Sequence, residues 1–190
     1  AGFGGAAGVG VSGAGANAKN VIGTDTKAFI SNSSVTSGGA VDLDAASTQS
    51  IIATIIAASV GVGVGGKAGV GASVGAALAE NFIGFDAAGT TNDDKTAEIR
   101  AYIVDWNIMA GGDLSATAIA NQGITAVVFA GSAAIAGSSG VGVGLSGSGV
   151  NAVNKIGAKV ESFISGDGAT GIKAGSVMLT AHDMSNIKAD

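Results

Sequence analysis

Side chains suited to acid–base or nucleophilic chemistry are few in this sequence. His182 is the only histidine, and it lies beside Asp183. A catalytic serine needs a histidine base that is oriented by a carboxylate and lies close to the nucleophile. The positions that align with His182 in the internal repeats described below are Ala46 and Ile119, which cannot replace it. We therefore interpret His182 as a solvated surface residue and predict no catalytic residues.

Carboxylate ligands for Ca²⁺ are the second candidate chemistry. Asp42 and Asp44 alternate along one predicted strand, Asp93 and Asp94 are adjacent in a polar loop, and Asp167 lies between two glycines. Such oxygens can gather Ca²⁺, but the calcium-binding nonapeptide GGxGxDxUx is absent. The aspartates also do not recur at equivalent positions. They are interpreted as solvated acids, and no metal site is predicted, although calcium binding stays an open alternative.

The glycine-rich run at residues 61–66 reads GVGVGG and is close to the GxGxxG fingerprint of dinucleotide-binding proteins. That fingerprint needs a strand before it and a helix after it, and a phosphate-binding loop needs Gly-Lys-Ser/Thr. Neither context is present, so the run is interpreted as close backbone packing and no cofactor is predicted. A nucleic-acid partner is not expected either, because the nine Lys and Arg residues are scattered and the net charge is −5.

The composition indicates an ordered protein built from small side chains. Glycine accounts for 34 of 190 residues, aromatic residues for 4%, and charged residues for 12%, and there is no proline or cysteine. Low charge argues against disorder, and abundant glycine suits stacked sheets that approach closely. The absence of cysteine is compatible with secretion. Because Ala1 opens directly into a glycine-rich strand, we expect a mature, excised or fragmentary chain without a signal peptide.

Internal repeats are the strongest signal in the sequence. Residues 8–23 (GVGVSGAGANAKNVIG) align with residues 69–84 (GVGASVGAALAENFIG) and with residues 143–157. A second block carries an aromatic–isoleucine pair after Lys27, Arg100 and Glu161, and a third block begins a strand at Val41, Leu114 and Val177. The period is about 63–73 residues. We predict a partial repeat over 1–50, a full repeat over 51–123 and a near-full repeat over 124–190, so the array begins and ends within repeats.

Period-two alternation predicts strands throughout the repeat. Residues 60–64 (VGVGV) and 69–71 alternate strictly, and five glycines between positions 61 and 69 exclude a helix there. Gly66-Lys67 is interpreted as a hairpin turn and residues 137–140 as its equivalent. Residues 73–82 could form a helix by propensity alone, but the matching glycines favour a strand. In residues 98–105, Ile99, Ala101 and Ile103 should share one face, and each repeat should supply about four strands.

A polar insertion occurs only in the middle repeat. Residues 85–94 read FDAAGTTNDD, a composition typical of surface loops. We expect this loop to project from the stack and to contribute little to stability. It is the most plausible place for a specific contact, and its candidate contact residues are Phe85, Asp86, Thr90, Thr91, Asn92, Asp93 and Asp94.

Two features resemble the repeats of giant bacterial surface proteins. One is the unit at residues 101–118. The other is the Gly/Val/Ala-rich segment of the repeat, which ends in Asn-Phe-Ile-Gly84 in the middle copy. These surface proteins are the filamentous-haemagglutinin-like and leukotoxin-like adhesins. The resemblance implies an all-β, elongated β-solenoid or stacked β-hairpin repeat in a secreted or cell-surface protein. It also implies a stalk or adhesive role, without catalytic residues.

Two functional hypotheses follow. The chain is an adhesin or stalk segment, or it is a subunit of an extracellular filament that assembles end to end through strand pairing. The expected partners are neighbouring repeats or copies of itself, with a host or surface ligand as a further candidate. A membrane-active toxin is a distant third, because residues 51–79 are weakly charged and interrupted only by Lys67. Glycine is too dense there for a spanning helix, and no membrane insertion is expected.

Overall fold

The computed structural model describes residues 1–90, 97–105, 107–166 and 171–190. About 80% of the chain is β-strand, and the described residues contain no helix. Every paired strand runs parallel to its partner. The predicted all-β class is therefore confirmed, and residues 73–82 belong to a strand as predicted.

The strands form four sheets, named A to D here. Sheet A contains β1 (Gly2–Gly4), β5 (Val41–Gly65), β9 (Leu114–Ser138), β13 (Val177–Asp183) and β14 (Asn186–Ala189). Sheet B contains β2 (Ala7–Ile22), β6 (Ala68–Ile83) and β10 (Val141–Ile156). Sheet C contains β3 (Thr26–Ser31), β7 (Ala97–Val104) and β11 (Ala158–Ser165), and sheet D contains β4 (Ser34–Ser37), β8 (Asn107–Ala110) and β12 (Ile172–Lys173).

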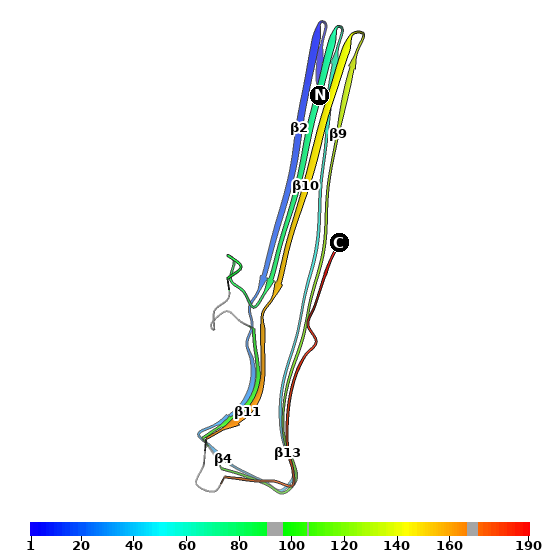
Figure 1. Cartoon of the computed structure of the whole chain (residues 1–190). Helices are drawn as coiled ribbons and strands as arrows, with labels where there is room; N and C mark the ends of the chain where they lie inside the picture. The colour runs from blue at the N-terminus through cyan, green and yellow to red at the C-terminus, as the bar shows by residue number, and fades with distance from the viewer. Residues whose placement is uncertain (91–96, 106, 167–170) are drawn as a thin grey trace.

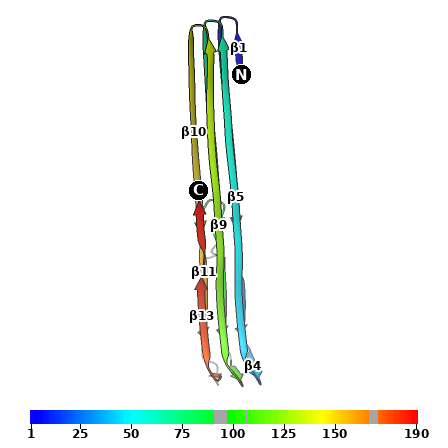
Figure 2. The same ribbon diagram turned by 90° about the vertical axis from the view of Figure 1, so that its right-hand side faces the viewer.

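The chain passes through the sheets in a fixed order, and we call one passage from sheet A through B, C and D a circuit. The central circuit consists of β5, β6, β7 and β8, which agrees with the four strands predicted for each repeat. Each strand pairs with the equivalent strand of the next circuit. β5 and β9 pair in this way over all 25 residues of each strand, and Figure 2 shows them running side by side along the whole molecule.

The parallel register places in one row the residues that align in the sequence. Ser12, Ser73 and Ser146 form one such row, and so do the three residues Ile22, Ile83 and Ile156. On the opposite side, Val41 pairs with Leu114, which pairs with Val177. The internal alignment therefore identified the residues that lie beside one another in space.

The predicted hairpin at Gly66-Lys67 is wrong. The strands that this turn joins are not paired with each other, since β5 belongs to sheet A and β6 to sheet B. At the turn, Lys67 N–H donates to the Ala6 carbonyl of the neighbouring circuit at 2.8 Å. Alternating glycines give each strand one face without side chains, so the two strands stack face to face instead of pairing edge to edge. The turn at Ser139-Gly140 has the same role.

The molecule has a broad base and a narrow arm, which are visible in Figure 1. At the base, the first parts of β5, β9 and β13 enclose a core together with sheets C and D. The buried residues of this core include Leu43, Ile99, Ile103, Ile108 and Leu114. Ile99, Ala101 and Ile103 share the buried face of β7, as predicted.

The arm consists of two facing sheets, with sheet B packed on the distal parts of β5 and β9. The inward side chains of β5 become smaller toward the tip: they change from Ile51 and Ile55 to Ala57 and Ser59, and beyond Gly61 only glycines point inward. Ser59 Oγ lies 2.7 Å from Ser73 Oγ of β6 in the interior. This decrease in side-chain size brings the sheets progressively closer, so the arm tapers.

Near the tip, the two backbones touch directly. A Cβ added at Gly63 would lie well inside 3.0 Å of the Val70 carbonyl oxygen, and one added at Gly10 would overlap the Val62 carbonyl oxygen in the same way. No side chain fits between the sheets at these positions. The glycine-rich run that resembles a nucleotide-binding fingerprint is therefore part of the arm interior.

Candidate interaction surfaces

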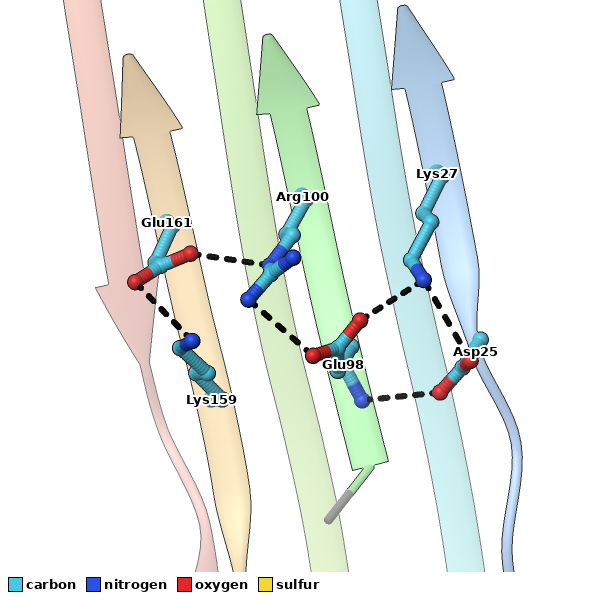
Figure 3. A network of polar contacts seen from close by, with 6 residues as sticks. All are labelled: Asp25, Lys27, Glu98, Arg100, Lys159 and Glu161. Atoms are coloured by element: carbon cyan, nitrogen blue, oxygen red, sulfur yellow. Dashed lines mark hydrogen bonds and ion pairs between the residues drawn. The ribbon is translucent and has the colours of Figure 1, made fainter. Parts of the chain in front are cut away.

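Six charged side chains form a network across the outer face of sheet C, shown in Figure 3. They belong to two rows of the parallel register, because Lys27 pairs with Arg100, which pairs with Glu161, and Glu98 pairs with Lys159 in the same way. Asp25 precedes β3 and occupies the Glu98 position of the first circuit. The two charge rows are thus Lys27–Arg100–Glu161 and Asp25–Glu98–Lys159.

Opposite charges meet both along the rows and between them. Glu98 accepts contacts from Lys27 Nζ at 2.6 Å and from Arg100 Nη2 at 3.0 Å. Arg100 Nε also lies 2.8 Å from a carboxylate oxygen of Glu161, and Lys159 Nζ lies 3.6 Å from the other oxygen. Because the Glu98 side chain is only 12% exposed, its charge is largely shielded from water and depends on these partners.

The carboxylates around Lys27 change the pKa of its ammonium group. Its hydrogen bond to Glu98 stabilises the ammonium form, and a weaker contribution comes from Asp25, so the pKa of Lys27 is raised above the ordinary lysine value. Asp25 Oδ1 also accepts the Glu98 backbone N–H at 3.3 Å. The network therefore joins the sheet C strands of all three circuits.

Two further rows carry polar or aromatic side chains across all three circuits. Asn20 Nδ2 donates to Asn81 Oδ1 at 2.8 Å, and Asn81 Nδ2 donates to Asn154 Oδ1 at 2.7 Å. On sheet C, Phe29, Tyr102 and Phe163 stack with centroid separations of 5.3 and 5.1 Å. Both rows use one kind of contact in every circuit, and this contact fixes the register between neighbouring strands.

The outer faces of the arm carry many exposed apolar side chains. Ile52 is 78% exposed on sheet A, and Val11 is 72% exposed on sheet B. Residues 1–18, 51–66, 68–79 and 124–154 contain no Asp, Glu, Lys or Arg, so the long distal part of the arm has a charged side chain only at Lys67 of the tip. Lys19, Glu80 and Lys155 of sheet B and Lys188 of β14 lie nearer the base. Sheet A contributes Phe3, Ile52, Ile56, Val60, Phe129 and Ile135 to these faces, and sheet B contributes Val9, Val11, Val74, Val141, Val143 and Leu145.

The predicted contact loop is only partly within the described residues. Thr91, Asn92, Asp93 and Asp94 lie outside them, so their contact role stays a prediction. Phe85, Asp86 and Thr90 are described: Thr90 Oγ1 donates to Asp86 Oδ2 at 2.5 Å, and the Phe85 ring lies 6.3 Å from the buried ring of Phe82.

The first part of this loop packs on the stack instead of projecting from it. Lys19 Nζ donates to the Ala87 carbonyl at 2.7 Å, and Lys155 Nζ donates to the Gly89 carbonyl at 2.8 Å. These lysines come from the circuits on either side. The prediction that the loop projects is therefore wrong for residues 85–90, because their aromatic ring and carbonyls find partners on the outer face of sheet B.

The remaining candidates for chemistry lie apart from one another. His182 is exposed on β13 and pairs in register with Ile119, while the carboxylate of Asp183 accepts hydrogen bonds from Ser185. Asp42 Oδ1 accepts the Ser115 hydroxyl at 2.6 Å, and Asp44 is exposed on the same strand. Asp167 lies outside the described residues, and within them no group of three or more His, Cys, Asp or Glu side chains could hold a metal ion.

The charge network was missed by sequence reasoning, although its signal was present. Lys27, Arg100 and Glu161 had been aligned, but only the neighbouring aromatic and isoleucine residues were used. A position that changes from Lys to Arg to Glu reads as variable in an alignment. In a parallel register the change from Arg100 to Glu161 places opposite charges next to each other.

The comparisons with known proteins leave the family of this chain open. No protein-family model matches it, and neither the search of curated proteins nor that of solved structures found a match. Among the described residues, no helix has the length and apolar character needed to cross a membrane.

Proposed function

We propose that this chain is a structural and adhesive segment of a secreted or cell-surface protein, built as an elongated β-solenoid. The observation that carries the proposal is the row-by-row register through all four sheets. Each circuit covers its neighbour with the same kinds of side chain. An architecture of this kind grows by adding circuits and gains stability with their number.

The long distal part of the arm, which carries a charge only at Lys67, is the proposed contact surface. Single exposed apolar side chains are ordinary, but a contiguous apolar patch marks a surface that binds another surface. Here the apolar side chains occupy both outer faces of the arm, and the charged residues lie at the base, at the part of the arm nearest the base, and at the tip. This distribution supports an elongated molecule with an apolar contact surface along the arm. Such a surface is consistent with the adhesins whose repeats the sequence resembles.

The proposal is tested by measuring adhesion of beads coated with the purified chain to host cells and to an apolar abiotic surface. Ile52→Lys with Ile56→Lys places charges on the arm face of β5. Ala46→Lys with Thr48→Lys places the same charges on the same strand and face, but at the base. We expect strong loss of adhesion for the arm variant only. Equal adhesion of both variants would refute a contact role for the arm.

A second candidate function is supported by the charge rows. They end with unlike charges at the two ends of the stack, as expected for a subunit of an extracellular filament that assembles end to end. This candidate shares the solenoid architecture with the first and differs in what covers the ends.

A further inference from the structure

Both ends of the stack present strands that are paired on one side only. Sheets B, C and D each contain three strands, and in the described residues their outer strands have a free edge. We call the end formed by β2, β3 and β4 the β3 end, and the end formed by β10, β11 and β12 the β11 end. Free edges leave N–H and C=O groups available for pairing with another chain.

The backbones of the two ends match. β2 and β10 both pair with β6 over the same 16 residues, so Ala7 and Val141 occupy equivalent positions beside Ala68. β3 and β11 are likewise related through β7, where Ser31 and Ser165 both pair with Val104. A β11 end placed on a β3 end would continue the existing register without shifting any strand.

The charges of the two ends are complementary in that arrangement. The β11 end presents Lys159 and Glu161, and the β3 end presents Asp25 and Lys27. Continuing the charge rows places Glu161 beside Lys27 of a second copy and Lys159 beside Asp25 of that copy. Neighbouring parallel strands are about 4.8 Å apart, and the side chains already bridge this spacing within the chain at 2.6 and 2.8 Å.

The asparagine ladder has a direction that also fits. Each amide nitrogen donates toward the β11 end, so the ladder leaves the Asn154 nitrogen at that end and the Asn20 oxygen at the β3 end. A donor on one end would therefore meet an acceptor on the other. The aromatic row ends in phenylalanine on both sides, Phe29 and Phe163, and would continue as a stack.

The apolar interior is open at both ends. Ile22 and Ile51 line a hollow beside the free edge of β2, and Ile156 and Ile187 line a hollow at the opposite end. Between them, Ile83 and Ile124 are fully buried. Stacking of a second copy would bring the two open hollows together and cover Ile22, Ile156 and Ile187, which are at least partly exposed.

We propose that the β11 end of one copy binds the β3 end of a second copy, head to tail, with the two charge rows fixing the register. The proposal rests on the solenoid architecture proposed above and specifies its partner as a second copy of this chain. The alternative is a symmetric dimer in which two β11 ends meet and their β11 strands pair antiparallel about a two-fold axis. In that dimer the arms would point to opposite sides and β10 would have no partner. Head-to-tail pairing therefore satisfies the backbone hydrogen bonds of more strands.

Disulfide cross-linking tests the register, because the chain contains no cysteine. Ser31→Cys and Ser165→Cys are made in separate preparations, mixed and mildly oxidised. In the proposed register the two Cα atoms lie about 5 Å apart, within the range of a disulfide. Ser31→Cys mixed with Ser162→Cys is the matched control, since Ser162 lies on the same strand β11 three residues before Ser165, on its other face, and this shift increases the Cα separation to about 11 Å.

We expect a disulfide-linked dimer from Ser31→Cys mixed with Ser165→Cys, and little from either variant alone or from the control mixture. Equal cross-linking in all mixtures, or none in any, would overturn the proposal. The adhesion assay is a separate readout. If no cross-link forms but the beads still adhere, the end-to-end contact is rejected and the adhesive function is retained. If the cross-link forms but the beads do not adhere, only the adhesive function is rejected.

A charge-swapped variant provides a second measurement. It combines Asp25→Lys, Lys27→Glu, Glu98→Lys, Arg100→Glu, Lys159→Glu and Glu161→Lys, so its internal pairs remain opposite in sign. We expect it to associate with itself and about 2- to 10-fold more weakly with the native chain, because the ion pairs along both rows are lost and only a diagonal pair of the Lys27–Glu98 kind remains. Equal affinity would contradict the charge code. If the variant does not fold, Lys159→Gln with Glu161→Gln should weaken self-association about 2- to 30-fold.

Discussion

The interior glycines of the arm offer a test in which the same substitution has opposite outcomes on the two faces of one strand. On β2, Gly10 faces sheet A and Gly15 faces solvent. A Cβ at Gly10 would overlap the Val62 carbonyl oxygen, while a Cβ at Gly15 meets nothing within 4 Å. The contact atom at Gly10 is backbone, so it cannot move aside by changing a rotamer. Gly10→Ala must therefore separate the two sheets or distort a strand.

The magnitude follows from the cost of overpacking. Inserting one extra carbon into a closely packed interior costs about 1–3 kcal/mol, and we expect Gly10→Ala to reach the upper part of this range. Gly15→Ala should be neutral or stabilising by up to about 1 kcal/mol, because alanine restricts the unfolded chain and fits the strand better. For a chain of this size, each kcal/mol corresponds to about 2–4 °C in Tm.

The two variants are compared by urea unfolding followed by circular dichroism, at one low protein concentration so that self-association contributes equally. We expect the midpoint of Gly10→Ala to fall and that of Gly15→Ala to stay or rise. If both variants shift by the same amount in the same direction, the two faces of β2 are equivalent and the close approach of the sheets is refuted.

Three further predictions concern single side chains. Gln122 is fully buried, and neither polar atom of its carboxamide has a partner among the described residues; Gln122→Leu should leave stability unchanged or raise it by about 1 kcal/mol in urea unfolding. The raised pKa of Lys27 means that its contribution is complete below its unfolded pKa, about 10.4, and is lost as the pH rises through the higher folded value. The stability difference between the native chain and Lys27→Met should therefore shrink in unfolding curves recorded at increasing pH above about 10.4. Phe85→Ala should cost about 1 kcal/mol by uncovering Phe82, and an unchanged Tm would show that the loop contributes no packing.

The sequence predicted the strands and the rows because both depend on local pattern. Alternation with a period of two is enough to place residues on the two faces of β5 and β7. Repetition at matching positions is enough to place Ser73 or Ile83 in register with its equivalents. Neither prediction depends on which sheet a strand belongs to.

The predicted hairpin failed for a physical reason that alternation does not encode. Two alternating strands joined by Gly66-Lys67 can either share hydrogen bonds or stack through their glycine faces. In the first arrangement the backbone N–H and C=O groups form hydrogen bonds within one repeat. In the second arrangement they form hydrogen bonds with strands of the neighbouring circuits. Here the equivalent strands β1 and β9 lie beside β5 and supply those hydrogen bonds, so stacking is possible. The choice depends on contacts between circuits, which no single repeat contains.

Some rows carry the same residue in every circuit and others change from circuit to circuit. The difference depends on whether a side chain attracts or repels a copy of itself on the neighbouring strand. A side chain that attracts its own kind can repeat in every circuit, as Asn81 does through its ladder and Ile83 does through its buried contact. A charged side chain repels its own kind at the spacing of parallel strands. A charge row is therefore stabilised where its sign changes between circuits, as it does between Arg100 and Glu161. Where two like charges adjoin, as Lys27 and Arg100 do, Glu98 of the neighbouring row contacts both of them. Positions of variable charge in an alignment of repeats are thus evidence of contact when the strands are parallel and in register.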